Sequence, residues 1–135
     1  MNSFFRSLVG VAFVSTIGLA QAAEPQVWIV SPVDGASVKS PVTVVFGLHQ
    51  PWGVAPAGVH QDKTGHHHLL VDTQVPDLKQ PIPKDAHHLH FGGGQTETTL
   101  VLAPGKHVLQ LLLGDFAHIP QQPPVLSTPV TITVD

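Results

Sequence analysis

Apolar and polar residues alternate with a period of two along most of the chain after residue 22. This period is typical of β-strands that bury one face, because successive side chains on a strand point to opposite sides. We expect strands over 26–31, 42–48, 65–73, 87–91, 95–102, 106–113 and 130–134. About seven strands at this spacing, with no helical period, predict an all-β, immunoglobulin-like antiparallel β-sandwich.

The turn at 103–105, Ala-Pro-Gly, has proline and glycine in the order that a type II turn requires. We therefore expect it to join 95–102 and 106–113 into a hairpin. His107 follows this turn, and the chain has no tyrosine. We expect the ring of His107 to bond back to the turn, as the tyrosine of a tyrosine corner does in many sandwich domains.

Two long segments between the expected strands are too rich in proline and glycine for regular structure. Trp52 lies in the first of them, 50–64, and we expect it to cover the end of the sandwich rather than to line a ligand pocket. The second, 76–85, carries three prolines and is expected to pack over a surface without joining a sheet.

The first 22 residues have the pattern of a secretory signal peptide. Arg6 supplies a positive charge, residues 8–20 are apolar or small, and residues 20–22 have the small-x-small form of a cleavage site. The apolar run is too short to span a bilayer and no later run is longer, so we expect no membrane span after cleavage. The sequence predicts a signal peptide over 1–22, a single domain over 23–135, and a periplasmic or secreted location.

Composition restricts both the partners and the metals. After cleavage, five lysines stand against nine acidic residues, which argues against nucleic acid or an anionic membrane as a partner. Cysteine is absent and the initiator is the only methionine, so the mature chain has no soft sulfur ligand for Cu(I). Imidazoles and carboxylates suit Cu(II), Zn(II) or Ni(II) instead.

Six of the ten histidines lie in two short segments, 65–72 and 87–94. Residues i and i+2 share one face of a strand and lie about 6.5 Å apart at the backbone, so two such imidazoles can reach one ion. A second His-x-His pair on a neighbouring strand would complete a metal site. The predicted ligands are His66, His68, His88 and His90, with His118 and Asp115 from the loop 114–126 as supporting ligands or as partners that orient an imidazole.

The register of the first histidine segment decides which rings point outward. If Leu69 faces the core, His67 also points inward, and His66 and His68 point outward. If Leu70 faces the core, the assignment reverses. We favour the first register, with His66 and His68 as the exposed pair. The alternative to metal binding is that the histidines fill polar strand positions and hydrogen-bond to loops.

Several long motifs carry a family resemblance: Gly-Val-Ala-Pro-Ala-Gly at 53–58, GHHHLLVD at 65–72, HLHFGGGQTE at 88–97 and Pro-Gly-Lys-His at 104–107. They resemble a family of small exported bacterial domains of unknown function, and the resemblance covers nearly all of 23–135. It implies export and a small domain, but no activity, substrate or catalytic residue. Members are sometimes labelled rod-shape-determining, and no residue pattern in this chain supports that label.

Two further likenesses concern copper proteins. The stretch 31–36 resembles the segment after the first strand of periplasmic copper-resistance sandwich proteins, which place a ligand histidine at the mature N-terminus. This chain has Ala23 or Glu24 there, so the likeness does not extend to that site. His-Leu-His-Phe-Gly at 88–92 resembles a strand of copper-zinc superoxide dismutase, but the cysteine pair of that family is missing.

Three classes of function remain open. The one we favour is a non-catalytic metal-binding module for Cu(II) or Zn(II). The second is a cell-envelope interaction domain that binds a protein or a glycan, with the histidines as a structural hydrogen-bond network. The third is a metal-dependent enzyme, such as a hydrolase that uses three imidazoles to generate a zinc-bound hydroxide, with Glu97 or Asp72 as the candidate base. No serine nucleophile motif is present.

Overall fold

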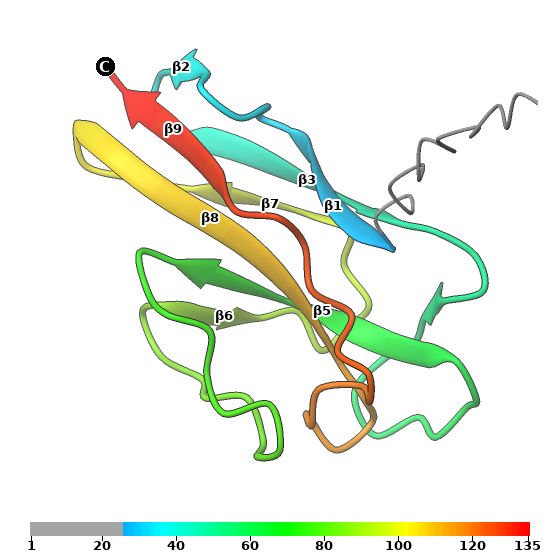
Figure 1. Ribbon diagram of the computed structural model, residues 1–135. Coiled ribbons are helices and arrows are strands. Elements are labelled where there is room, and N and C mark those ends of the chain that lie inside the picture. Colours follow the sequence, from blue (N-terminus) through cyan, green and yellow to red (C-terminus); the bar gives the residue numbers. More distant parts are fainter. Residues whose placement is uncertain (1–25) are drawn as a thin grey trace, which may run out of the picture.

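The computed structural model describes residues 26–135, which form two β-sheets packed face to face (Figure 1). The smaller sheet has the order β1-β3-β7, formed by β1 (Val27–Ser31), β3 (Val42–Leu48) and β7 (Glu97–Leu100). The larger sheet has the order β2-β9-β8-β5-β4, formed by β2 (Ser37–Val38), β9 (Val130–Val134), β8 (Gly105–Gly114), β5 (Thr64–Val71) and β4 (Gly53–Val54). One further strand, β6 (His88–His90), pairs with β5. The predicted all-β sandwich is confirmed, whereas the predicted signal peptide lies outside the described residues.

The core lies between the two sheets and is filled by the alternating apolar residues that the sequence pattern singled out. The smaller sheet contributes Val27, Ile29, Val42, Val44 and Phe46. The larger sheet contributes Leu69, Val71, Leu109, Leu111, Leu113, Val130, Ile132 and Val134. Burial of these side chains is the main favourable contribution to folding, at about 25 cal/mol per Å² of apolar surface removed from water.

The predicted hairpin of 95–102 and 106–113 is wrong, because β7 and β8 lie in different sheets. Strand β7 pairs with β3, where Thr43 and Thr99 lie opposite each other. Strand β8 pairs instead with β5 on one side and β9 on the other. The turn 103–105 therefore carries the chain from one sheet to the other, and Gly105 takes a φ of 126° there.

Two predicted structural roles are confirmed near the ends of the sandwich. The Nε2 of His107 lies 2.7 Å from the carbonyl oxygen of Ala103, so the ring bonds back to the preceding turn. Its Nδ1 lies 2.7 Å from a carboxylate oxygen of Asp72, and this hydrogen bond raises the pKa of His107. Trp52 is partly buried and packs against the core cluster, as expected.

Short strands make the larger sheet mixed rather than purely antiparallel. Within the loop 50–64, β4 runs parallel to the start of β5, although the prolines and glycines predicted no regular structure there. Strand β2 runs parallel to β9 and takes the outer position, so β9 is not the edge strand of this sheet. Among residues 26–135, no helix is long and apolar enough to cross a membrane.

Both faces of β5 are buried, which explains its nearly continuous run of histidine and aliphatic residues. Leu69 and Val71 face the core, and His67 packs against Phe46 with ring centroids 5.1 Å apart. The favoured register is therefore confirmed. The expected exposure of His66 and His68 is wrong, because loops 76–85 and 115–124 cover the outer face and leave these side chains 0% and 1% exposed.

Candidate metal centre

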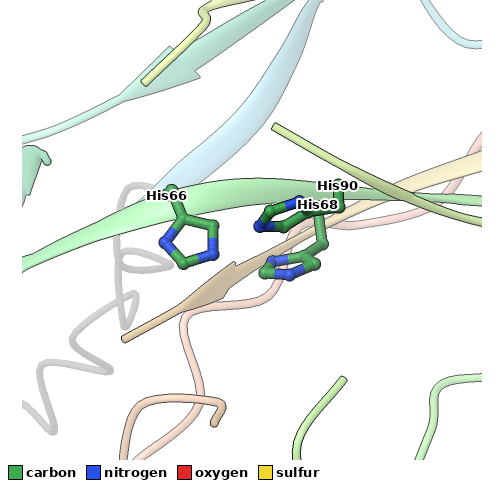
Figure 2. A group of neighbouring side chains, drawn as sticks. All are labelled: His66, His68 and His90. Carbon is green, nitrogen blue, oxygen red and sulfur yellow. The ribbon is translucent and has the colours of Figure 1, made fainter. Parts of the chain in front are cut away.

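Three histidines from two neighbouring strands meet on the outer face of the larger sheet. His68 on β5 pairs directly with His90 on β6, and His66 precedes His68 by two residues on the same face. One ring nitrogen from each of the three lies within 4.8 Å of the other two. Figure 2 shows the three imidazole rings grouped beside the β5 ribbon. This arrangement can hold a metal ion, because imidazole nitrogen is a good ligand for Zn(II) and Cu(II).

The ring nitrogens of this group are buried without hydrogen-bond partners among the described residues. Both nitrogens of His66, both nitrogens of His68 and the Nε2 of His90 are in this state. Buried polar groups in folded proteins are nearly always paired, and leaving one unpaired costs about 1–3 kcal/mol. Five unpaired nitrogens at one spot therefore require a physical explanation.

A fourth imidazole, His118 from the loop after β8, stands against the same group. Its ring centroid lies 5.0 Å from that of His66, 4.8 Å from that of His90 and 6.1 Å from that of His68. The loop holds His118 at a φ of 66°. The carboxylate of Asp115 fixes this turn by accepting the backbone N–H groups of Ala117 and Ile119.

Burial keeps the imidazoles of His66 and His68 neutral at ordinary pH. Burial, and then the neighbouring His90 and His118, lower the pKa of His66 to about 4, while Asp115 acts in the opposite direction. Burial and then His66 lower the pKa of His68 to about 3. The backbone of His66 acts in the opposite direction on the pKa of His68, although neither ring nitrogen of His68 has a hydrogen-bond partner within the described residues. Burial also lowers the pKa of His90. Neutral imidazole is the form that binds metal.

Glycines provide the space that the rings occupy. A Cβ atom on Gly114 would lie 2.7 Å from Cε1 of His68, and one on Gly92 would lie 2.3 Å from Cε1 of His90. Both distances are shorter than van der Waals contact allows. The chain therefore places glycine on β8 and after β6 at the two points where an imidazole lies against the backbone.

A pocket of about 300 Å³ leads to the cluster from outside. His68, His90 and His118 line it. Pro81, Ile82 and Lys84 of the proline-rich segment also line it. The backbone N–H of Ile82 donates to the carbonyl oxygen of His118, so this segment is joined to the loop that carries the fourth ring. As expected, it packs over a surface without joining a sheet.

The chain segment that matches a known family includes this whole site. Residues 44–135 match the family described as domain of unknown function, DUF4399. The chain belongs to the DUF4399 family. This match agrees with the expected membership of a family of unknown function. Within this DUF4399 domain, the matched part begins in β3 and contains all the histidines named above. Neither the search of curated proteins nor the search of solved structures found a match.

The structure of this DUF4399 domain brings together some of the predicted ligands and separates others. His66, His68 and His90 converge, with His118 beside them. His88 is outside the group because its Nδ1 donates a hydrogen bond, 2.8 Å long, to the carboxylate of Asp85. Asp115 is also outside, since one of its carboxylate oxygens caps its own turn. The ligand role of His66, His68, His90 and His118 stays a prediction.

The sequence interpretation missed residues that complete the site. Gly114 and Ile82 were not predicted to belong to the site, yet one makes room for His68 and the other lies beside it. The signal for Gly114 was its place at the end of a core strand that pairs with the histidine strand. That signal can be recognised only when β8 is known to pair with β5. The predicted hairpin had instead paired β8 with β7.

Proposed function

We propose that this protein is a non-catalytic metal-binding module that holds Cu(II) or Zn(II) through His66, His68 and His90. The observation that carries the proposal is the set of buried, unpaired ring nitrogens that face one another. A bound ion would supply the missing partner for one nitrogen of each ring. The ring nitrogens lie within 4.8 Å of one another. Nitrogens bound to one tetrahedral ion lie about 3.4 Å apart, so only small shifts of the rings are needed.

The same observation argues against histidines that serve only as a structural network. A hydrogen-bond network of imidazoles needs acceptors for its N–H groups and donors for its bare nitrogens. The described residues offer none to His66 or His68. Nor does charge repulsion hold the cluster open, since the lowered pKa values leave His66 and His68 neutral near pH 7.

The surroundings favour binding over catalysis. Asp72, one of the two carboxylates expected as a base, accepts hydrogen bonds from His107 and from the backbone N–H of Val108 at the far end of β5. Glu97, the other, begins β7 in the opposite sheet. The pocket beside the cluster gives an ion a way in, which a buried site needs if it is to load and release. We propose a periplasmic or secreted location from the signal-peptide pattern of residues 1–22.

Isothermal titration calorimetry on untagged protein tests the ligand assignment. The double variant His68→Ala/His90→Ala removes two of the three ligands and is expected to abolish tight binding of Zn(II) and Cu(II). The matched control is His88→Ala, which alters the same strand outside the group and is expected to keep the affinity of the unchanged protein. Equal affinity of the double variant and the unchanged protein would reject the assignment. Elemental analysis of the untagged protein purified from its native compartment identifies the ion.

A further inference from the structure

Four imidazoles, rather than three, surround one point on the outer face of β5. The six distances between the ring centroids of His66, His68, His90 and His118 are 4.8, 5.0, 5.0, 5.1, 6.1 and 4.8 Å. The rings come from β5, β6 and the loop after β8, so three separate parts of the chain contribute. Each of the four rings therefore lies close to the other three.

These distances match the geometry of a tetrahedral site. A Zn–N bond of about 2.05 Å, with the ring centroid about 1.1 Å beyond the nitrogen, places four centroids about 5.1 Å apart at the corners of a tetrahedron. Five of the six observed distances lie between 4.8 and 5.1 Å. Only the distance from His68 to His118, at 6.1 Å, is longer.

A square arrangement, which Cu(II) favours, does not fit. It would require four centroid distances of about 4.5 Å and two opposite diagonals of about 6.3 Å. The one long distance joins His68 and His118, and the distance opposite to it, between His66 and His90, is 5.0 Å. The four rings therefore do not lie at the corners of a square.

Among residues 26–135, the hydrogen bonds that hold His118 in place are made by its backbone and not by its ring. Its backbone N–H donates to the carbonyl oxygen of Asp115, and its own carbonyl oxygen accepts the N–H of Ile82. The three-histidine group whose nitrogens lie within 4.8 Å of one another does not include His118. Rotation about its Cβ–Cγ bond, a soft torsion in histidine, turns a nitrogen toward the centre with little movement of the ring centroid.

Asp115 supplies charge to such a site without binding the ion. Four neutral imidazoles leave the two positive charges of the ion uncompensated, and burial makes this costly. The carboxylate of Asp115 is fixed by the N–H groups of its own turn, and its field reaches the ring of His66. The carboxylate of Asp115 thus offsets part of the charge of the ion.

We propose that His118 is the fourth ligand of a tetrahedral four-imidazole centre, and that the ion this centre takes is Zn(II) rather than square Cu(II). The proposal rests on the proposed function and adds to it the ligand count, the geometry and the ion. Zn(II) adopts a tetrahedral arrangement without strain, whereas Cu(II) would be bound in a distorted one.

Cobalt substitution tests the geometry, because tetrahedral Co(II) absorbs visible light far more strongly than five- or six-coordinate Co(II). The unchanged protein loaded with Co(II) is expected to show the intense tetrahedral spectrum. His118→Asn is expected to lose that intensity and to lower the Zn(II) affinity at least about tenfold. Loss of a residue that only orients a ligand already lowers metal affinity about 10- to 100-fold. Asparagine tolerates the left-handed backbone of this position but has no imidazole nitrogen to bind the ion.

Controls separate the inference from the proposed function. His88→Ala is expected to keep both the spectrum and the Zn(II) affinity, and the thermal unfolding of metal-free His118→Asn reports whether the turn survives. If His118→Asn keeps both spectrum and affinity, or if the unchanged protein gives a weak six-coordinate spectrum, the inference is overturned while three-histidine binding stands. If the unchanged protein binds neither Co(II) nor Zn(II), the proposed function fails, and the inference fails with it.

Discussion

His67 shows how one position in the histidine run differs from its two neighbours. Its ring lies between the sheets against Phe46, with no exposed surface and with no hydrogen-bond partner for either nitrogen among residues 26–135. Burial lowers its pKa to about 4, so it is neutral there. His66 and His68 point to the opposite face of the same strand. Only those two can therefore share an ion with β6.

We expect His67→Leu to leave metal binding intact and to leave the stability unchanged or raised. Leucine has a similar size and removes two buried polar atoms that have no partner, a change that can be neutral or stabilising. His68→Leu, the matched variant on the other face, should instead lose tight binding. Calorimetric titration with Zn(II) and urea unfolding of both variants check this pair. Loss of binding in His67→Leu alone would show that the assignment of faces is incorrect.

At the scale of elements, the site depends on how closely β5 and β8 approach each other. Gly114 pairs with His66 across the two strands, and its bare α-carbon lies against the ring of His68. The side of β8 that faces the core is filled by leucines, whereas its last residue makes room on the other side. The pairing of the two strands thus sets the position of the imidazoles.

Gly114→Ala is expected to displace the ring of His68 and to weaken Zn(II) binding. The added methyl group would lie 2.7 Å from Cε1 of His68 and 3.2 Å from Cδ1 of Ile82. Overpacking of this kind costs about 1–3 kcal/mol. Gly53→Ala is the control, because its methyl group would meet only Thr64 at 3.7 Å. Urea unfolding and Zn(II) titration of the two variants measure the difference, and equal behaviour would contradict the role given to Gly114.

Sequence patterns predicted the strands well because the period of two is local. The alternation over 130–134 matches the burial of β9 residue for residue, and the alternation over 42–46 matches that of β3. The pairing of strands is not local, so the turn chemistry at 103–105 wrongly predicted a hairpin within one sheet. For the same reason the sequence located His66 and His68 on the outward face of β5 but not the loops that bury them. The hydrogen bond between His88 and Asp85 was likewise not predictable, because it depends on a turn and the period of a strand carries no information about turns.

For the molecule as a whole, burying neutral histidines makes folding sensitive to acid. The pKa values of His66, His67 and His68 lie at about 4, 4 and 3 in the folded state, below the ordinary value of 6.5. The unfolded chain binds more protons than the folded one below pH 6.5, so stability falls as the pH drops from there toward 4. His107 opposes this trend, because its raised pKa contributes stability in acid that is lost as the pH rises through that value.

We expect the metal-free protein to lose up to about 4 kcal/mol of unfolding free energy between pH 7.5 and pH 5.5, or about 1.4 kcal/mol per buried histidine. The contribution of His107 reduces this loss. Urea unfolding in the presence of a chelator at the two pH values measures it, and His67→Leu should lose about 1.4 kcal/mol less than the unchanged protein. Stability that is flat over this range would show that the three rings are not buried in neutral form.

The central claim is that an ion lies among these imidazoles, and X-ray absorption spectroscopy of the untagged, Zn(II)-loaded protein tests it most directly. We predict one tightly held ion with nitrogen neighbours at about 2.0–2.1 Å and the outer-shell scattering of several imidazole rings. A shell of oxygen neighbours without imidazole scattering, or a protein that retains no ion after desalting, would contradict the account.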